Sequence, residues 1–433
     1  ARRVGLSSRI ARDGLWSFLL KVVSTGLSFL VAVVLARALG AEGYGVYTYT
    51  YALVMLLALP AQAGLPNLVL RETARGMAQG RPDLVQGIWR WAARAAVLLS
   101  IVLVLLPATV LLLYRGARME LREWTLAWAL ALVPLVALGN LRGAALRGVG
   151  RIVTGQLPEF VIRPGLFLML ALGFALGRAG HLSPPMAMAL HVVAAAIGFG
   201  GGAWLLWRHV PPAVRQSRPE FQARAWLGST IPLAVIAAMQ MVNNQADILI
   251  LGVFRPDDEV GIYRVAVQAA TLASFGLQAV NTVVAPRFAR LYAKGEIDQL
   301  QQLATASARV VLGFNLAVTV FFVVFGKAVL KLVFGPAFIT SYVPLLILLV
   351  GQFVNSGMGS VGLLLNMTGH ERDTARGVAI AAVGNVVLNL LLIPAFGVSG
   401  AALATSITLV LWNVMLWRAV RKRLGINSMA VNI

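Results

Sequence analysis

The sequence contains no cysteine, which excludes disulfides, thiol catalysis and cysteine-based metal sites. Its four histidines are scattered, and it has no HExxH zinc motif, no GxSxG nucleophile motif and no phosphate-binding Gly-Lys-Ser loop. Charge is also scarce, because only 12% of the 433 residues are Asp, Glu, Lys or Arg, about half the usual share of a soluble protein. We therefore expect no catalytic residues, metal ion or cofactor, and we do not expect an enzyme.

Long apolar runs fill most of the chain, which is 59% hydrophobic and has a mean hydropathy of +0.81. A helix needs about 20 apolar residues to cross a hydrocarbon core of roughly 30 Å, and runs near this length recur from end to end. These runs predict an all-α polytopic membrane protein. We place its twelve transmembrane helices at residues 14–36, 46–69, 95–114, 124–141, 159–177, 185–207, 227–253, 263–285, 310–326, 343–366, 378–396 and 400–417.

The basic residues are distributed unevenly among the segments between these spans. With the N-terminus inside, 26 of the 37 Lys and Arg residues fall on the inner side, including Arg142 directly after the fourth span, and eight fall outside. By the positive-inside rule, both termini are predicted to lie in the cytoplasm. We expect the protein in the cytoplasmic (inner) membrane. The net charge of +21 is explained by this orientation, so we expect no nucleic-acid partner.

An internal repeat relates the two halves of the chain. Gly45-Val46-Tyr47 recurs as Gly261-Ile262-Tyr263, 216 residues later, and the same spacing within one residue relates three single positions. These positions are Arg75, Gly80 and Asp83, which match Arg290, Gly295 and Asp298. Six helices per half make the repeat parallel, with a substrate site expected between the halves near the membrane midplane. We predict two six-helix lobes at residues 1–207 and 227–433, joined by a basic cytoplasmic linker at 208–226.

Polar side chains recur at helical spacing on the helices that begin each predicted lobe. Inside a membrane such residues are costly, and they usually face a cavity or another helix. We expect the following residues to line a substrate-binding cavity: Lys21, Ser24, Thr48, Tyr51, Gln240, Asn243, Asn244, Arg264 and Gln268.

Three charged residues within these helices each allow two interpretations. Lys21 either lines the cavity as a cation or extends its long side chain to the membrane surface. Arg264 lies close to the outer end of its helix, where it either anchors the helix at the interface or contacts an anion. Asp247 either pairs with one of these two cations or binds a coupling cation, which makes it the ion-coupling candidate.

Other polar residues in the spans favour a structural role. Arg163 follows Glu159 by four residues, the spacing of an intrahelical ion pair. We expect His191 to be a packed, hydrogen-bonded histidine. Asn385 and Asn389 are typical of the amides that hydrogen-bond neighbouring membrane helices.

Five turn and loop motifs occur in a fixed order along the whole chain. They are Leu39-Gly40-Ala41-Glu42-Gly43-Tyr44-Gly45-Val46-Tyr47, Gly64-Leu65-Pro66 followed by Arg71 and Ala74, Phe334-Gly335-Pro336-Ala337-Phe338, Met367-Thr368-Gly369 and Gly397-Val398-Ser399-Gly400-Ala401-Ala402. Together with the repeat, they resemble the polysaccharide-transporter branch of the multidrug/oligosaccharidyl-lipid/polysaccharide (MOP) flippase superfamily.

This resemblance implies two six-helix lobes forming a V, transport by alternating access, and a cationic cavity. It implies a flippase that carries a polyprenyl-diphosphate-linked oligosaccharide from the cytoplasmic to the outer leaflet. Lys21 and Arg264 fall on helices where the superfamily places cavity cations. Membrane lipids, glycosyltransferases and a glycan polymerase are the expected partners.

Two alternatives remain beside the flippase. A cation-coupled multidrug exporter of the same superfamily would need acidic or aromatic cavity groups, whereas the basic candidates here outnumber the acidic one. A membrane glycan polymerase or ligase would need an outer acceptor site and a catalytic cluster, but the outer loops are short and no such cluster is visible.

Overall fold

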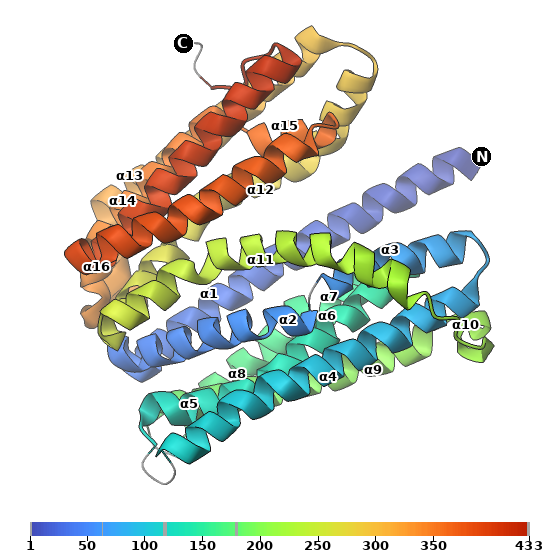
Figure 1. The fold of residues 1–433 in the computed structure, drawn as a ribbon. Coiled ribbons are helices and arrows are strands. Elements are labelled where there is room, and N and C mark those ends of the chain that lie inside the picture. Colours follow the sequence, from blue (N-terminus) through green and yellow to red (C-terminus); the bar gives the residue numbers. More distant parts are fainter. Residues whose placement is uncertain (1, 63, 116–118, 178–180, 431–433) are drawn as a thin grey trace. The chain divides into compact units, whose positions relative to one another are not determined.

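The computed structural model describes residues 2–62, 64–115, 119–177 and 181–430, and every regular element within these ranges is a helix (Figure 1). The chain forms two compact units. Unit 1 comprises Ala1–Leu39 and Thr50–Met241, and unit 2 comprises Gly40–Tyr49 and Val242–Ile433. The predicted lobes at 1–207 and 227–433, with their linker at 208–226, stay a prediction.

The first ten helices of the described chain lie in unit 1, except for the part of α1 at Gly40–Tyr49, which belongs to unit 2. They are α1 (Arg2–Leu57), α2 (Leu59–Gln62), α3 (Leu65–Ala78), α4 (Pro82–Arg115), α5 (Leu121–Leu130), α6 (Leu132–Gly148), α7 (Ile152–Leu157), α8 (Arg163–Leu176), α9 (Pro184–His209) and α10 (Pro212–Gln216), with a π-helical turn at Pro158–Ile162 between α7 and α8. The next helix, α11 (Ala223–Phe254), begins in unit 1 and ends in unit 2.

Unit 2 continues with fewer and longer helices. They are α12 (Asp257–Ala293), α13 (Ile297–Val333), α14 (Tyr342–Met358), α15 (Val361–Met367) and α16 (Glu371–Leu424), with a 3₁₀ turn at Pro336–Ser341 before α14.

Ten helical segments of the described chain are long and apolar enough to cross a membrane. Two of them contain a glycine with a non-helical backbone, Gly40 in α1 (φ 69°, ψ −175°) and Gly397 in α16 (φ 54°, ψ −130°). These glycines lie where two predicted spans meet. Beyond Gly397 the chain doubles back, since Gly377 packs against Leu416 across the two limbs of α16. The predicted all-α polytopic fold is confirmed, while the number twelve stays a prediction.

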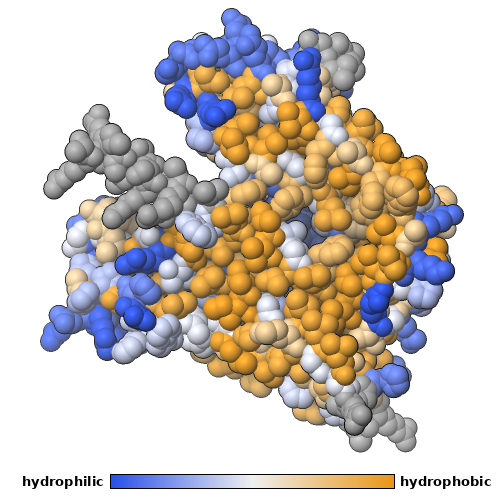
Figure 2. Space-filling view, turned by 180° about the vertical axis from the view of Figure 1, so that it is seen from behind, coloured by the Kyte–Doolittle hydropathy of each residue, from blue (hydrophilic) through white to orange (hydrophobic). Residues whose placement is uncertain are grey.

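Large apolar side chains are exposed along the long helices. Leu106 and Leu113 on α4 are 68% and 78% exposed, and Leu391 on α16 is 66% exposed. Hydrophobic residues cover most of the face in Figure 2, and hydrophilic residues gather along its margins. In water each Å² of such surface would cost roughly 25 cal/mol, but hydrocarbon removes that cost. The chain is a multi-pass membrane protein.

The repeat read from the sequence corresponds to repeated geometry. Gly80 ends the turn after α3 with φ 66°, and Gly295 ends the turn after α12 with φ 74°. A side chain at either position would be strained, because a positive φ is open mainly to glycine. Gly45 and Gly261, the first residues of the matched tripeptides, pack against each other within unit 2.

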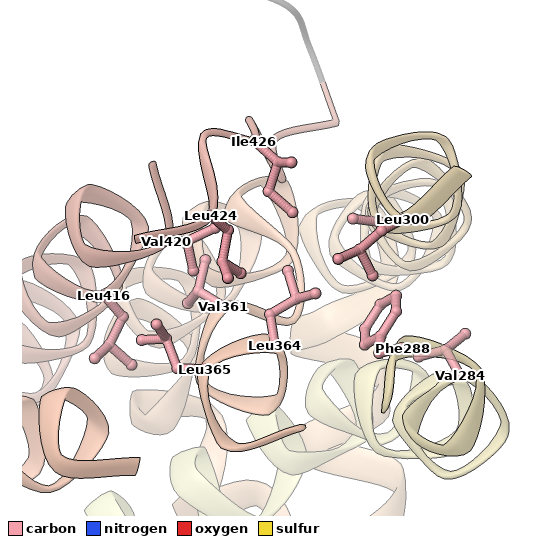
Figure 3. Packing of buried hydrophobic residues seen from close by; sticks show 11 residues of the cluster. Val284, Phe288, Leu300, Val361, Leu364, Leu365, Leu416, Val420, Leu424 and Ile426 are labelled. Carbon is pink, nitrogen blue, oxygen red and sulfur yellow. The ribbon is translucent and has the colours of Figure 1, made fainter. Parts of the chain in front are cut away.

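The core of unit 2 includes a cluster of buried apolar side chains near the end of the chain. In Figure 3, Phe288 of α12 lies beside Leu300 of α13 and Leu364 of α15, and all three are fully buried. Leu424 and Ile426 join the same cluster from the end of α16 and the segment after it. This packing holds the segment after α16 against the rest of unit 2.

Hydrogen bonds also hold the residues that follow α16. The side-chain amide of Gln301 donates to the Asn427 carbonyl and accepts from the Asn427 N–H, at 2.5 Å for the second bond. The Ala430 N–H donates to the Gly357 carbonyl at 2.9 Å. Because α14 and α15 are separated by a break that follows Gly357, the C-terminal segment satisfies backbone groups that this break leaves open.

Candidate functional site

A buried carboxylate forms the centre of a polar cluster in unit 2. Asp247 of α11 is only 9% exposed. Its Oδ2 accepts hydrogen bonds from the Tyr263 hydroxyl at 2.7 Å and the Thr405 hydroxyl at 2.6 Å, and its Oδ1 accepts one from the Asn389 amide at 2.8 Å. A charge in a membrane interior needs such partners, since water cannot supply them.

The fold of α16 brings two of these donors to one carboxylate. Asn389 lies on the limb before the Gly397 reversal and Thr405 on the limb after it, so the antiparallel limbs present both side chains to α11. Asn389 also donates to the Asn385 side-chain oxygen at 3.0 Å. Carboxylate, amide and hydroxyl oxygens gathered this way are the donor set of a hard cation such as Na⁺.

Arg264 lies one residue beyond the tyrosine of this cluster. Its guanidinium interacts with the hydroxyl of Tyr44, which also contacts Thr48. Among the described residues no carboxylate lies within 4 Å of Arg264, so the direct pair with Asp247 is not formed. Tyr44 and Thr48 are buried, whereas Arg264 is half-buried. Two of the predicted cavity residues, Thr48 and Arg264, therefore both contact the hydroxyl group of Tyr44.

The other candidates are spread over both units. Lys21, Ser24, Tyr51 and Gln240 belong to unit 1, and Asn243, Asn244 and Gln268 belong to unit 2. Lys21, Gln240 and Asn244 are exposed, while Gln268 is 8% exposed. Tyr51 stacks on His191, with ring centroids 5.3 Å apart. Their role in a shared cavity stays a prediction.

Unit 1 contains a buried ionic network that the sequence only partly indicated. Arg142 of α6 donates to Glu159 at 3.0 Å and to the Phe199 carbonyl at 2.8 Å. Glu159 also pairs with Arg163 at 3.5 Å, as predicted from their spacing. Arg163 in turn donates to His191 at 2.9 Å, and His191 is packed and hydrogen-bonded as predicted.

The sequence placed Arg142 directly after the fourth span, and the structure places it inside a helix and away from solvent. Helix α6 continues to Gly148, and Arg142 is 5% exposed. A side chain at Gly202 of α9 would overlap the guanidinium, so this glycine makes room for it. The run Gly200-Gly201-Gly202 was the available signal, since small residues allow close approach of membrane helices.

Comparison with known proteins then decides the family. Residues 10–292 match the family described as polysaccharide biosynthesis protein. The chain belongs to the polysaccharide biosynthesis protein family. This confirms the family that the sequence motifs indicated.

Similar proteins match this family member over most of its length. A probable low-salt glycan biosynthesis flippase, Agl15 of Haloferax volcanii, is 26% identical over 406 residues, which cover 92% of this chain and 81% of the relative. The lipid II flippase MurJ in an inward closed conformation matches with a TM-score of 0.74 and 12% identity, covering 94% of this chain and 87% of that chain. An inward-facing multidrug transporter of the MATE family, in the MOP superfamily, also matches with a TM-score of 0.74, at 16% identity, covering 93% and 94%.

Within this polysaccharide biosynthesis protein, the family match covers only part of the polar cluster. Asp247 and Tyr263 lie inside residues 10–292, whereas Asn389 and Thr405 lie beyond them. The Asp247 carboxylate thus lies in the matched segment, but two of its hydrogen-bond donors come from outside it and reach it only in the folded chain.

Proposed function

We propose that this protein is a flippase that moves a polyprenyl-diphosphate-linked oligosaccharide from the cytoplasmic to the outer leaflet by alternating access. The observation that carries this proposal is family membership together with a flippase relative aligned over 92% of the chain. It is a transporter and not an enzyme. Both curated relatives are named probable flippases, and one is named a glycan biosynthesis flippase.

Cations and polar side chains provide the chemistry that such a substrate needs. A lipid diphosphate brings negative charge into a medium where charge is poorly solvated, and a half-buried Arg264 stabilises it better than a fully hydrated cation would. Lys21 is the second proposed phosphate contact. Hydroxyl and amide groups such as Tyr51, Gln240 and Asn243 suit the hydroxyls of the sugars.

Asp247 is the proposed ion-coupling residue. Its carboxylate contacts the hydroxyl oxygens of Thr405 and Tyr263, and the Asn389 amide joins it to the Asn385 oxygen, so a cation would find several oxygen ligands there. A bound cation would replace hydrogen bonds between the two limbs of α16 and α11, and that change would link ion binding to helix position. The membrane potential is the alternative driving force.

We place the protein in the cytoplasmic membrane with both termini in the cytoplasm, which the 26-to-8 charge bias supports. In this orientation the substrate would come from cytoplasmic glycosyltransferases. A glycan polymerase would then use the product on the outer side.

The proposal is tested by transport in proteoliposomes that carry a fluorescent lipid-linked oligosaccharide. We expect Arg264→Ala to slow translocation by roughly tenfold or more, because a charged hydrogen bond to phosphate contributes about 1.5–3 kcal/mol. Lys21→Ala should reduce the rate in the same direction. The matched control is Arg418→Ala, which removes an exposed cation at the end of α16.

Normal translocation by both variants would refute the assignment of these cations as phosphate contacts. A wild-type protein that leaves lipid-linked oligosaccharide in place but exports organic cations would refute the flippase and favour the drug exporter.

Asp247→Asn tests the coupling role separately. The amide keeps the size of the carboxylate and can still accept a hydrogen bond, so the variant should fold. We expect its transport to lose its dependence on a sodium or proton gradient, whereas Asp258→Asn, an exposed change at the start of α12, should keep it. An unchanged gradient dependence in Asp247→Asn would contradict the proposal.

A further inference from the structure

A basic cavity lies between the end of α12 and the start of α13. Its volume is about 640 Å³, and Arg287, Arg290, Lys294 and Glu296 are among its lining residues. We call it the α12–α13 cavity. Its apolar lining includes Leu291 and Leu303, which pack on the buried cluster of Figure 3. The cavity is therefore supported by a packed core and does not depend on surface side chains alone.

The charges of the α12–α13 cavity are not balanced. Lys294 lies 3.5 Å from Glu296, the one carboxylate among the lining residues. Arg287 and Arg290 are both exposed, and no carboxylate in the described part of the chain lies within 4 Å of either. Two guanidinium groups three residues apart share one helix face. Such a pair favours an anion, and guanidinium suits phosphate oxygens in particular.

The cavity lies at the depth where the protein surface changes from apolar to charged. On α12, Val283 is 59% exposed and precedes Arg287 by one helical turn, or about 6 Å. On α13, Val310 is 64% exposed and follows the lining residue Ala306 by one turn, and Phe314 continues the apolar face. Exposed apolar side chains on both helices therefore lead from the hydrocarbon directly to the two arginines.

The matched position in unit 1 differs in charge. At the repeat offset of 215, Arg290 corresponds to Arg75 and Arg287 corresponds to Glu72. Glu72 pairs with Arg75 at 3.9 Å, so unit 1 neutralises its own arginine. Unit 2 has two cations where unit 1 has an ion pair.

The matched position in unit 1 is also covered. Gly87, which corresponds to Gln302 of the cavity, lies under the backbone of Glu220, so that a side chain there would overlap the carbonyl. The Glu220 carboxylate meets Arg81 at 2.7 Å. In unit 1, Glu220 of the chain itself therefore covers Gly87 with its backbone and pairs its carboxylate with Arg81. In unit 2 the residue that matches Gly87, Gln302, is exposed.

We propose that the α12–α13 cavity binds the phosphate of an anionic membrane phospholipid, held by Arg287 and Arg290, with its acyl chains along Val283, Val310 and Phe314. The continuous apolar face favours a lipid over a soluble anion. Only a lipid can contact the arginines with its phosphate and the apolar side chains with its acyl chains. Basic pockets between helices at the headgroup level are suited to such lipids. This site does not depend on which substrate the protein transports.

The test is native mass spectrometry of the purified full-length protein with phosphatidylglycerol, using phosphatidylcholine as the zwitterionic control. We expect Arg287→Gln/Arg290→Gln to weaken phosphatidylglycerol binding on the order of tenfold or more, from two lost charges near the membrane surface. The matched control is Arg418→Gln/Lys422→Gln, which removes two exposed cations of α16 outside the cavity and should change binding less than threefold.

A variant that is expected to strengthen binding separates a loss of the site from a general loss of structure. Glu296→Gln removes the carboxylate that faces Lys294, so phosphatidylglycerol should bind severalfold more tightly. Equal binding by wild type and Arg287→Gln/Arg290→Gln would overturn the proposal. So would equal affinity for phosphatidylcholine, or binding of inorganic diphosphate as tight as that of phosphatidylglycerol, because the lipid would then not be the ligand that the site selects.

Discussion

Removing the carboxylate at the centre of the unit 1 network should strongly destabilise the protein. Glu159→Gln leaves Arg142, whose side chain is 4% exposed, without its ion-pair partner at 3.0 Å. Breaking a buried pair from one side typically costs about 3–5 kcal/mol, since the remaining charge stays buried. Arg142 keeps the Phe199 carbonyl at 2.8 Å and lies over the Phe199 ring at 5.5 Å. We therefore expect the low end, about 3 kcal/mol.

The measurement is the free energy of unfolding in detergent by chemical denaturation. The control is Glu72→Gln, because Glu72 pairs with an Arg71 whose side chain is 53% exposed, and such pairs contribute about 0–1 kcal/mol. Combining Glu159→Gln with Arg142→Met should cost less than the sum of the single changes, since no buried charge is left unpaired. A cost for Glu159→Gln no larger than that of the control, or strict additivity, would refute the reasoning.

Three further changes test packing and turns by the same measurement. Gly261→Val should prevent native packing in unit 2, because the added Cβ would overlap the Ala41 carbonyl. Gly295→Ala should cost about 1 kcal/mol, since φ is 74° and left-handed geometry is unfavourable for a residue with a Cβ. Gln301→Ala should cost about 1–3 kcal/mol by leaving the Asn427 N–H without its acceptor, and it should speed proteolysis after α16.

Gly313→Ala is the control for the two glycine changes. Gly313 lies within α13, and no heavy atom would lie within 4 Å of the added Cβ. We expect a neutral effect, or a stabilisation of up to about 1 kcal/mol from helix propensity. If Gly261→Val and Gly295→Ala behaved like this control, neither close packing nor backbone geometry would explain these glycines.

Local patterns were enough to predict the elements of this protein. Apolar runs of membrane length predicted helices, and the structure has them. Gly80 and Gly295 were matched as repeat positions, and both have a positive φ. The four-residue spacing of Glu159 and Arg163 predicted their ion pair. Each of these features depends on residues that are neighbours in the chain, so composition and period carry the information.

The site was only partly accessible in this way. Asp247 was singled out from the sequence as the ion-coupling candidate. Asn389 and Thr405 were not predicted to donate hydrogen bonds to it, because they are 142 and 158 residues away in the chain. Arg142 was placed directly after a predicted span, since a cation after an apolar run usually marks the membrane surface. Its burial depends on Glu159 and on the space left by Gly202, which no periodicity reveals.

By itself, the sequence determined the helical membrane class and the family, because hydrophobic runs and short motifs are read from residues that are near one another in the chain. The parallel relation of two six-helix halves stays a prediction. The tertiary structure alone decided which polar groups satisfy one another and which stay open. Glu72 neutralises Arg75 in unit 1, whereas in unit 2 Arg287 and Arg290 have no such partner among the described residues. Charge compensation acts through space across helices, and only the folded chain brings those groups together.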